Sequence, residues 1–380
     1  MKIKNYLNLA KNNYIQRKYP ISLVHFVTNR CNARCSFCFI DFDNPETFKG
    51  ELSVDEIEKL SLTLGNSIQN INLTGGEPFA RKEIKEISEI YIKNSNIGSL
   101  FITSNGSLPD RIENYLNTLV PKYPETKFIF SFSIDNIENK HDKIRKIEGL
   151  FEKCIESYNL TKEYGNNVFG NISITVSLEN YFEIESIYKK LIEKYKVEAL
   201  TVALVRDEGV YKTPIKDKEN LLNSYKWLTE KIKEDESKNI LYGYNRKTLQ
   251  GRLQNQKNTI MYKNIISTYL EPKFISQCYA GSLFGVISAD GKVYPCEILE
   301  DTLGSLRDYN MDFMKLWSNE KTTKTKKWIK DTKCNCSYEC AWSFNILRFL
   351  KTFLLLVTII PPWPVVIILF GANEKHPAIP

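Results

Sequence analysis

Three cysteines near the amino terminus constrain this chain more than any other feature. They stand in the run Cys31-Asn-Ala-Arg-Cys35-Ser-Phe-Cys38, which has the spacing C-x3-C-x2-C. Three thiolates on one short loop can hold three irons of a 4Fe-4S cube and leave the fourth iron without a protein ligand. Residues 21–28 just before the loop are apolar and β-branched. We therefore expect a buried strand that carries the loop at its carboxyl end.

A zinc site or a disulfide loop is the alternative for this motif. Zinc takes four ligands, and the nearest other candidate is His25, which lies inside the expected strand. Eight of the nine cysteines fall in two groups with metal-site spacing, and one stands alone. This distribution suits iron-sulfur clusters in a reducing cytosol better than disulfides. The two groups and the isolated residue are Cys31, Cys35 and Cys38; Cys278, Cys296, Cys334, Cys336 and Cys340; and Cys154. We expect Cys154, in a helical stretch, to be a packed core thiol.

A second motif, Thr-Gly-Gly-Glu-Pro, occupies residues 74–78. With both motifs, the chain resembles the radical S-adenosylmethionine (SAM) enzymes. Phe37 supplies the aromatic residue that precedes the third cysteine. The resemblance implies that the three cysteines hold the catalytic cluster, whose open iron chelates the amino and carboxylate groups of SAM. It also implies reductive cleavage of SAM to a 5′-deoxyadenosyl radical, with an electron donor such as ferredoxin or flavodoxin.

Further cofactor contacts are expected where later strands end. In the family, the Gly-Gly-Glu-Pro turn holds the methionyl amino group of SAM, with the glutamate adjusting the loop or pairing with that cation. Ser-x-Asp at 133–135 resembles a stretch that faces the ribose. His141 and Arg145 resemble part of a short helix that follows it in the family, and a surface helix face is the alternative for both. Arg206 can reach a carboxylate or phosphate through paired hydrogen bonds. The candidates are Phe37, Gly75, Gly76, Glu77, Pro78, Ser104, Asn105, Ser133, Asp135, Arg145 and Arg206.

Strand-like and helical stretches alternate through the first half of the chain, which predicts a parallel α/β array. The expected strands are 21–28, 69–74, 99–103, 128–133, 171–177 and 199–205. The resemblance implies a partial (β/α)6 barrel of the radical SAM type. In such barrels, ligand groups collect at the carboxyl ends of the strands.

A second cysteine group follows a stretch without chemical motifs. Residues 284–294 read as a β-hairpin with an Asp-Gly turn, which would bring the flanking Cys278 and Cys296 together. With the later cysteines, this resembles the auxiliary-cluster extension called SPASM, or its shorter twitch form. A complete extension has seven cysteines, whereas five are present here, so we expect one auxiliary 4Fe-4S cluster. Which two of Cys334, Cys336 and Cys340 are ligands stays open, and structural zinc is the alternative.

The carboxyl-terminal tail is apolar. Residues 352–370 carry no charge, but Pro361-Pro-Trp-Pro364 divides them into halves that are each too short to cross a membrane. A shallow membrane anchor competes with a tail that folds back on the barrel or forms a dimer contact. We divide the chain into a lead-in, the barrel, a helical linker region, the auxiliary domain and the tail, at residues 1–20, 21–206, 207–273, 274–343 and 344–380.

Composition narrows the function. The net charge of +7 arises from 52 basic and 45 acidic residues. The two signs are interspersed and form no basic block, so we expect no nucleic-acid partner. We expect a cytoplasmic enzyme, or one peripheral on the inner face of the membrane, of the oxidoreductase or maturase type. Its substrate would be a peptide or protein side chain, or a membrane lipid or lipid-linked precursor. A non-catalytic, membrane-associated iron-sulfur protein for electron transfer or assembly is the alternative.

Overall fold

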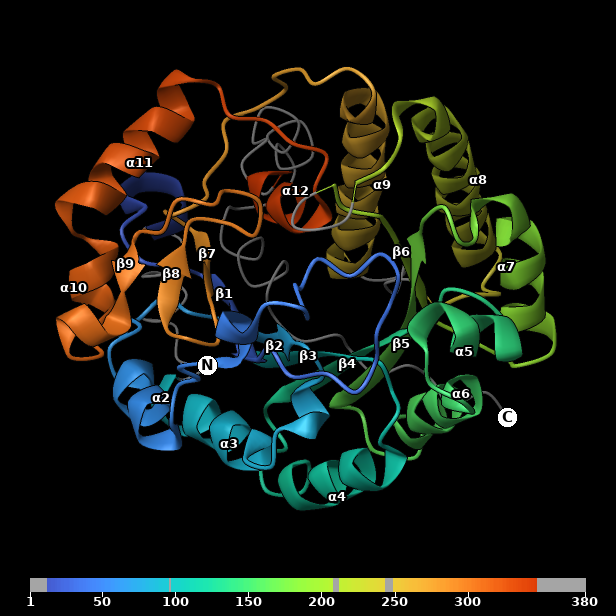
Figure 1. Ribbon diagram of the computed structural model, residues 1–380, viewed down its shortest axis with the longest axis horizontal. Coiled ribbons are helices and arrows are strands. Elements are labelled where there is room, and N and C mark those ends of the chain that lie inside the picture. Colours follow the sequence, from blue (N-terminus) through green and yellow to red (C-terminus); the bar gives the residue numbers. More distant parts are fainter. Residues whose placement is uncertain (1–11, 96, 208–211, 243–248, 347–380) are drawn as a thin grey trace.

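The computed structural model describes residues 12–95, 97–207, 212–242 and 249–346. Its framework is a nine-stranded sheet in the order β6-β5-β4-β3-β2-β1-β7-β8-β9 (Figure 1). The strands are β1 Ser22–Thr28, β2 Asn70–Gly75, β3 Ser99–Ser104, β4 Lys127–Ser133, β5 Val168–Val176, β6 Leu200–Leu204, β7 Phe284–Ile287, β8 Lys292–Tyr294 and β9 Gly304–Ser305.

The six predicted barrel strands are confirmed. Strands β1 to β6 pair in sequence order and are all parallel. Within the described residues, β6 and β9 are the two edges of the sheet and do not pair with each other. The fold is therefore an open, partial α/β barrel, as expected.

Helices surround the outside of this arc (Figure 1). Those that follow the barrel strands are α2 Val54–Ser61, α3 Ile84–Ser95, α4 Pro109–Leu119, α5 Asn139–Arg145, α6 Leu150–Leu160 and α7 Ile184–Glu193. The later helices are α8 Lys218–Ser237, α9 Leu249–Tyr269, α10 Phe313–Trp317, α11 Glu320–Asp331 and α12 Glu339–Asn345. Short turns of 3-10 or π type are Asn12–Gln16, Pro45–Phe48, Pro78–Ala80, Tyr181–Glu183, Ile215–Asp217 and Leu306–Tyr309. A capping box of Ser53 and Glu56 begins α2 as predicted.

Alternation along the strands separates the two faces of the sheet. Leu73, Ile102 and Phe130 point toward the helices and lie in the main hydrophobic core. The positions between them point the other way, onto what we call the inner face, and many are half-exposed. The inner face is therefore open to ligands while the outer face stabilises the fold.

The hairpin between Cys278 and Cys296 joins the barrel sheet directly. Its first strand, β7, lies parallel to β1 with Ser22 opposite Phe284, and β8 pairs antiparallel with β7 around the predicted turn. Gly285 of β7 lies against the buried Trp317 ring, where an added β-carbon would come within 2.7 Å. The sequence does not predict this pairing, which makes the auxiliary segment a continuation of the barrel.

No helix in the described part of the chain is both long and apolar enough to cross a membrane. The predicted tail segment at 352–370 lies outside the described residues. The membrane anchor and the five-part division of the chain stay predictions.

Candidate functional site

The three-cysteine loop begins where β1 ends. Cys31, Cys35 and Cys38 are half-buried. The Ala33 amide donates a hydrogen bond to the Cys31 sulfur at 3.3 Å. Burial raises the pKa of the Cys31 thiol to about 12 and raises the pKa of the other two thiols. Because a ligand must be a thiolate, bound iron would have to offset this desolvation.

The donor set fits an iron-sulfur cluster with one free iron. The three thiols are close enough for Cys35 and Cys38 to raise the pKa of Cys31. Among the described residues, however, no three His, Cys, Asp or Glu side chains converge as they would around a single metal ion. A 4Fe-4S cube takes one thiolate on each of three irons, which three cysteines on one loop can supply, whereas zinc needs a fourth ligand.

The Gly-Gly-Glu-Pro turn packs directly on the strand that carries the cysteines. A β-carbon on Gly75 would lie 2.0 Å from the Thr28 carbonyl oxygen, and one on Gly76 would lie 2.1 Å from that of Arg30. The Gly76 amide donates to the Thr28 carbonyl at 2.8 Å, and the Glu77 amide donates to Arg30 at 2.9 Å. Only glycine permits this approach, so the two motifs form one rigid unit.

Glu77 links that turn to the end of β3. Its Oε1 accepts hydrogen bonds from the Ser104 hydroxyl at 2.8 Å and from the Phe79 amide at 3.0 Å, and its Oε2 accepts from the Asn105 amide at 2.7 Å. Burial raises the pKa of this carboxyl, against the opposing effect of these hydrogen bonds. Asn105 in turn donates to the Cys31 sulfur at 3.8 Å. The structure thus gathers these predicted residues around the cysteine loop.

A buried ion pair supports the other side of the loop. Arg145 donates to Asp135 Oδ2 from Nη2 at 2.7 Å and from Nε at 2.8 Å, and the Thr175 amide donates to Oδ1 at 3.1 Å. His141 and Arg145 are both buried, so the surface-helix alternative for them is wrong. The Arg145 guanidinium lies over the Phe37 ring at 5.9 Å, and its carbonyl accepts from the Arg34 amide of the loop at 3.0 Å. Contact of Ser133 and Asp135 with a ribose stays a prediction.

The five later cysteines gather in a second cluster. All are half-buried around a small apolar core that includes Phe284 and Tyr338. The Leu299 amide donates to the Cys296 sulfur at 3.4 Å. Burial is the main cause that raises the pKa of each thiol, and the proximity of Cys278 and Cys296 raises the pKa of Cys334 and Cys336 further. The fourth ligand of this group stays undecided. Cys154, by contrast, is fully buried in the main core, as predicted.

Arg206 pairs with a carboxylate, as predicted for a ligand, but this carboxylate belongs to a residue of the chain itself. The guanidinium lies 3.4 Å from Glu297 and stacks on the Tyr338 ring at 4.2 Å. Glu339 is next to them, and its Oε1 accepts from the Leu204 amide and from the Tyr225 hydroxyl, each at 3.1 Å. Burial raises the pKa of Glu339 to about 7.

Two family models match the two cysteine regions. The model of the radical SAM superfamily matches residues 26–191. The chain therefore contains a radical SAM domain. The model of the SPASM iron-sulfur cluster-binding domain matches residues 278–341. The predicted cofactors of this radical SAM chain, a SAM-binding 4Fe-4S cluster, SAM and auxiliary iron-sulfur, are confirmed at the level of the two domains.

Curated radical SAM relatives share part of the sequence. Fe-coproporphyrin III synthase of Methanosarcina barkeri is 29% identical over 182 residues, which are 47% of this chain and 42% of the relative. GTP 3′,8-cyclase of Tolumonas auensis is 28% identical over 40% of this chain and 44% of its own length. The sporulation killing factor maturation protein SkfB of Bacillus subtilis is 28% identical over 45% and 39%. This chain thus spans less than half the length of these relatives.

Solved structures share the fold. The structure of anSMEcpe with bound AdoMet and the Cp18Cys peptide superposes with a TM-score of 0.57 at 21% identity, over 89% of this chain and 98% of that one. SuiB of Streptococcus suis, bound to the precursor peptide SuiA, gives a TM-score of 0.53 at 16% identity, over 83% and 68%. The alignment therefore extends beyond the barrel.

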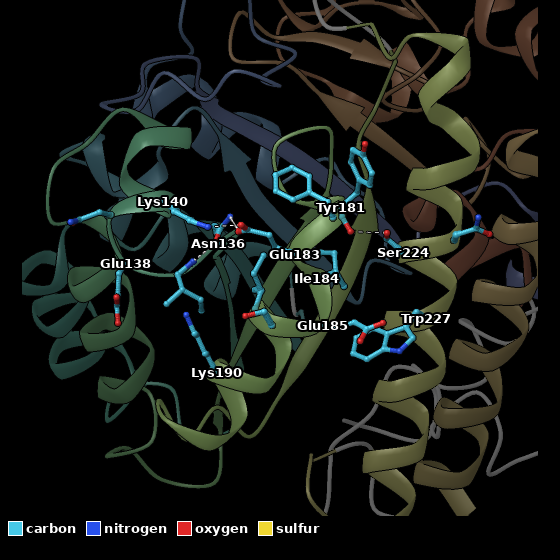
Figure 2. Close-up of a pocket in the computed structure, with 16 residues that line it drawn as sticks. Asn136, Glu138, Lys140, Tyr181, Glu183, Ile184, Glu185, Lys190, Ser224 and Trp227 are labelled. Carbon is cyan, nitrogen blue, oxygen red and sulfur yellow. Dashed lines mark hydrogen bonds and ion pairs between the residues drawn. The ribbon is translucent and has the colours of Figure 1, made fainter.

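A pocket of about 730 Å³ opens where α7 faces α8 (Figure 2). Its lining comes from the segments after β4 and β5 and from α8. Figure 2 shows Asn136, Lys140 and Glu183 together on one side and Trp227 on the other. Asn136 directly follows the buried Asp135, but neither Asp135 nor Arg145 lines the pocket.

Two residues near the site, Asn180 and Glu297, are not predicted from the sequence. Asn180 donates through Nδ2 to the carbonyls of Asp135 and Thr175, both at 2.8 Å, and closes the end of β5. Glu297 directly follows Cys296, but nothing in the sequence indicates its pairing with Arg206. The position of Asn180 after a strand is the one feature that could have identified it.

Proposed function

We propose that this chain is a radical SAM maturase that abstracts a hydrogen atom from a residue of a peptide or protein. When bound and reduced, the cluster with SAM supplies the 5′-deoxyadenosyl radical for this step. The chain's own residues orient the cofactor loop and hold the substrate away from bulk water. The observation that carries the proposal is the chemistry of the inner face.

The inner face carries uncharged hydrogen-bonding groups beside apolar side chains such as Phe101 and Ile129. Five of its hydroxyls make no hydrogen bond with another described residue, and all five positions are half-exposed. They belong to Thr74, Thr103, Ser133, Ser173 and Thr175. Ser133 lies opposite Ser173 in the register of β4 and β5, so the groups are neighbours. Such groups suit the amides and neutral side chains of a polypeptide.

Charged substrates fit this face poorly. In the described strands β2 to β6, its one charged side chain is Lys127, at the amino end of β4 and far from the cysteine loop along the strand. Two arginines near the rim, Arg145 and Arg206, are paired with Asp135 and Glu297. A nucleoside triphosphate, as in the cyclase relatives, would need unpaired cations.

The names of similar proteins agree with a polypeptide substrate. The structure of anSMEcpe holds a peptide, SuiB binds a precursor peptide, and SkfB is named as a maturation protein. A lipid or lipid-linked precursor is the second candidate, and it rests on the uncharged residues 352–370 alone. The electron donor and the membrane surface remain expected partners of the same reaction.

Hydrogen transfer to 5′-deoxyadenosine tests the proposal. Reconstituted protein would be incubated without oxygen with SAM, dithionite and one deuterated pool at a time: peptides, GTP or a lipid extract. We expect deuterium in 5′-deoxyadenosine from the peptide pool. We expect Thr175→Val to lower this transfer several-fold while cleavage without substrate is unchanged, and the exposed Thr332→Val to match the wild type. Transfer from GTP or lipid and none from peptides would contradict the proposal.

A further inference from the structure

We propose that Arg206, Glu297 and Tyr338, which we call the polar bridge, fix the auxiliary cysteine group to the barrel and set the reduction potential of the cluster it holds. This inference rests on the auxiliary iron-sulfur cluster and is independent of the substrate. It assigns these three side chains a positioning and electrostatic role toward a cluster that they do not ligate.

Direct contacts define the polar bridge. Arg206 Nη2 lies 3.4 Å from Glu297 Oε2 and donates to the Tyr338 hydroxyl, which in turn donates to Glu297. The guanidinium also stacks over the Tyr338 ring at 4.2 Å. The Glu297 side chain is 8% exposed and that of Arg206 is 25% exposed, so solvent screens the pair little.

The polar bridge connects three parts of the chain that lie far apart in sequence. Arg206 follows β6 at the carboxyl end of the barrel, Glu297 follows Cys296, and Tyr338 stands two residues before Cys340. The Cys340 thiol is itself hydrogen-bonded to Glu297. Both ligand-bearing segments of the auxiliary group are therefore tied to the end of one barrel strand.

Charge close to a cluster changes how readily it accepts an electron. Reduction adds a negative charge, which a neighbouring carboxylate opposes and a neighbouring guanidinium favours. Glu297 should hold the potential down and Arg206 should hold it up. Removing the two charges one at a time should therefore shift the potential in opposite directions, whereas loosening the segment would shift it in one direction.

Potentiometric titration followed by electron paramagnetic resonance tests the inference. All variants would be made in full-length Cys31→Ala/Cys35→Ala/Cys38→Ala protein, so that only the auxiliary cluster contributes a signal. We expect Glu297→Gln to raise the midpoint potential and Arg206→Gln to lower it, at unchanged iron content. Arg206→Lys, which keeps the charge, should lie nearer the parent protein than Arg206→Gln.

A second ion pair supplies the matched control. Arg307 binds Glu56 of α2 at 2.7 Å and also links the auxiliary part to the barrel, but neither residue contacts a cysteine in the described contacts. Glu56→Gln should leave the potential unchanged. Shifts of one sign in Glu297→Gln and Arg206→Gln, or no shift, would overturn the inference. If Glu297→Gln loses iron, its potential cannot be compared and the two arginine variants decide the test. Equal shifts of the potential in Arg206→Lys and Arg206→Gln would then overturn the inference.

Discussion

Around the cysteine loop, individual residues are held by buried polar contacts as well as by packing. Glu77 joins the glycine turn to Ser104 and Asn105, and Asp135 joins Arg145 to the end of β5. Each of these carboxylates has its oxygens occupied by partners from the protein. Their role is therefore to fix the shape of the site, and loss of one partner would leave a buried group unpaired.

The close approach of Gly76 to the cysteine strand gives the first prediction. Gly76→Ala would place a β-carbon 2.1 Å from the Arg30 carbonyl oxygen, so the turn must move. We expect a loss of about 2 kcal/mol or more in the free energy of unfolding and at least tenfold weaker SAM binding. Urea denaturation and equilibrium dialysis of the reconstituted protein measure the two effects.

Gly165 offers the control, since an added β-carbon there meets nothing within 4 Å. Gly165→Ala should change the free energy of unfolding by less than about 1 kcal/mol and leave SAM binding intact. Equal behaviour of the two alanine variants would show that the turn does not position SAM.

His25 should make stability depend on pH. Burial on the outward side of β1 lowers its pKa to about 3, with a smaller contribution from Arg81, against 6.5 for the free side chain. The unfolded chain therefore binds one more proton between these values, and the folded state loses stability as pH falls from 6.5 toward 3. The loss from this residue is up to about 1.4 kcal/mol per pH unit.

Urea unfolding of wild type and His25→Leu from pH 7 to pH 4.5 measures this slope. The variant is expected to be less stable at pH 7, because the Tyr91 hydroxyl loses its partner at 2.7 Å. The difference between the two proteins should nevertheless shrink as pH falls. A constant difference would mean that His25 does not titrate on unfolding.

Motif residues could be predicted from sequence and their partners could not. The cysteines and glycines stand at fixed spacing on single loops, so the sequence specifies them. The pairing of Arg206 with Glu297, in contrast, depends on how two distant segments pack. The same limit explains why His141 and Arg145 allowed a surface interpretation, although the structure buries both.

At the scale of elements, the hairpin that extends the sheet depends on one tryptophan. Trp317 at the end of α10 is fully buried, stacks on Phe313 at 5.1 Å and covers Gly285 of β7. We expect Trp317→Ala to lower the free energy of unfolding by about 3–5 kcal/mol, because it opens a large cavity beneath β7. Thermal denaturation and iron content of the auxiliary group are the measurements.

Trp328 of α11 is the matched control, since it is 50% exposed. Trp328→Ala should cost less than about 1 kcal/mol. If both variants lost the same stability, Trp317 would not support the hairpin in the way described.

Alternating or apolar runs identify the six barrel strands, because each must bury at least one face. The pairing partner of β7 could not be predicted in this way. A strand of four residues carries too little pattern to specify whether it pairs with β1 or stands in a separate domain. The family resemblance indicates an auxiliary domain, but only the structure shows that it continues the barrel sheet.

In the whole molecule, the two cysteine groups lie beside strands of one continuous sheet with an open inner face. The three-cysteine loop follows β1, the auxiliary hairpin pairs with β1, and the polar bridge ties the second group to β6. This arrangement places both sites around the same polar surface, where the proposed polypeptide substrate would lie. The central claim is that the first group holds the cluster at which SAM is cleaved.

Iron content and 5′-deoxyadenosine formation in anaerobically reconstituted protein test that claim most directly. Wild type and the buried-thiol control Cys154→Ala should each hold about eight irons and release 5′-deoxyadenosine from SAM under dithionite. Cys31→Ala/Cys35→Ala/Cys38→Ala should keep about four irons and release none. Cleavage that survives in the triple variant, or a wild type with about four irons and no cleavage, would contradict the account.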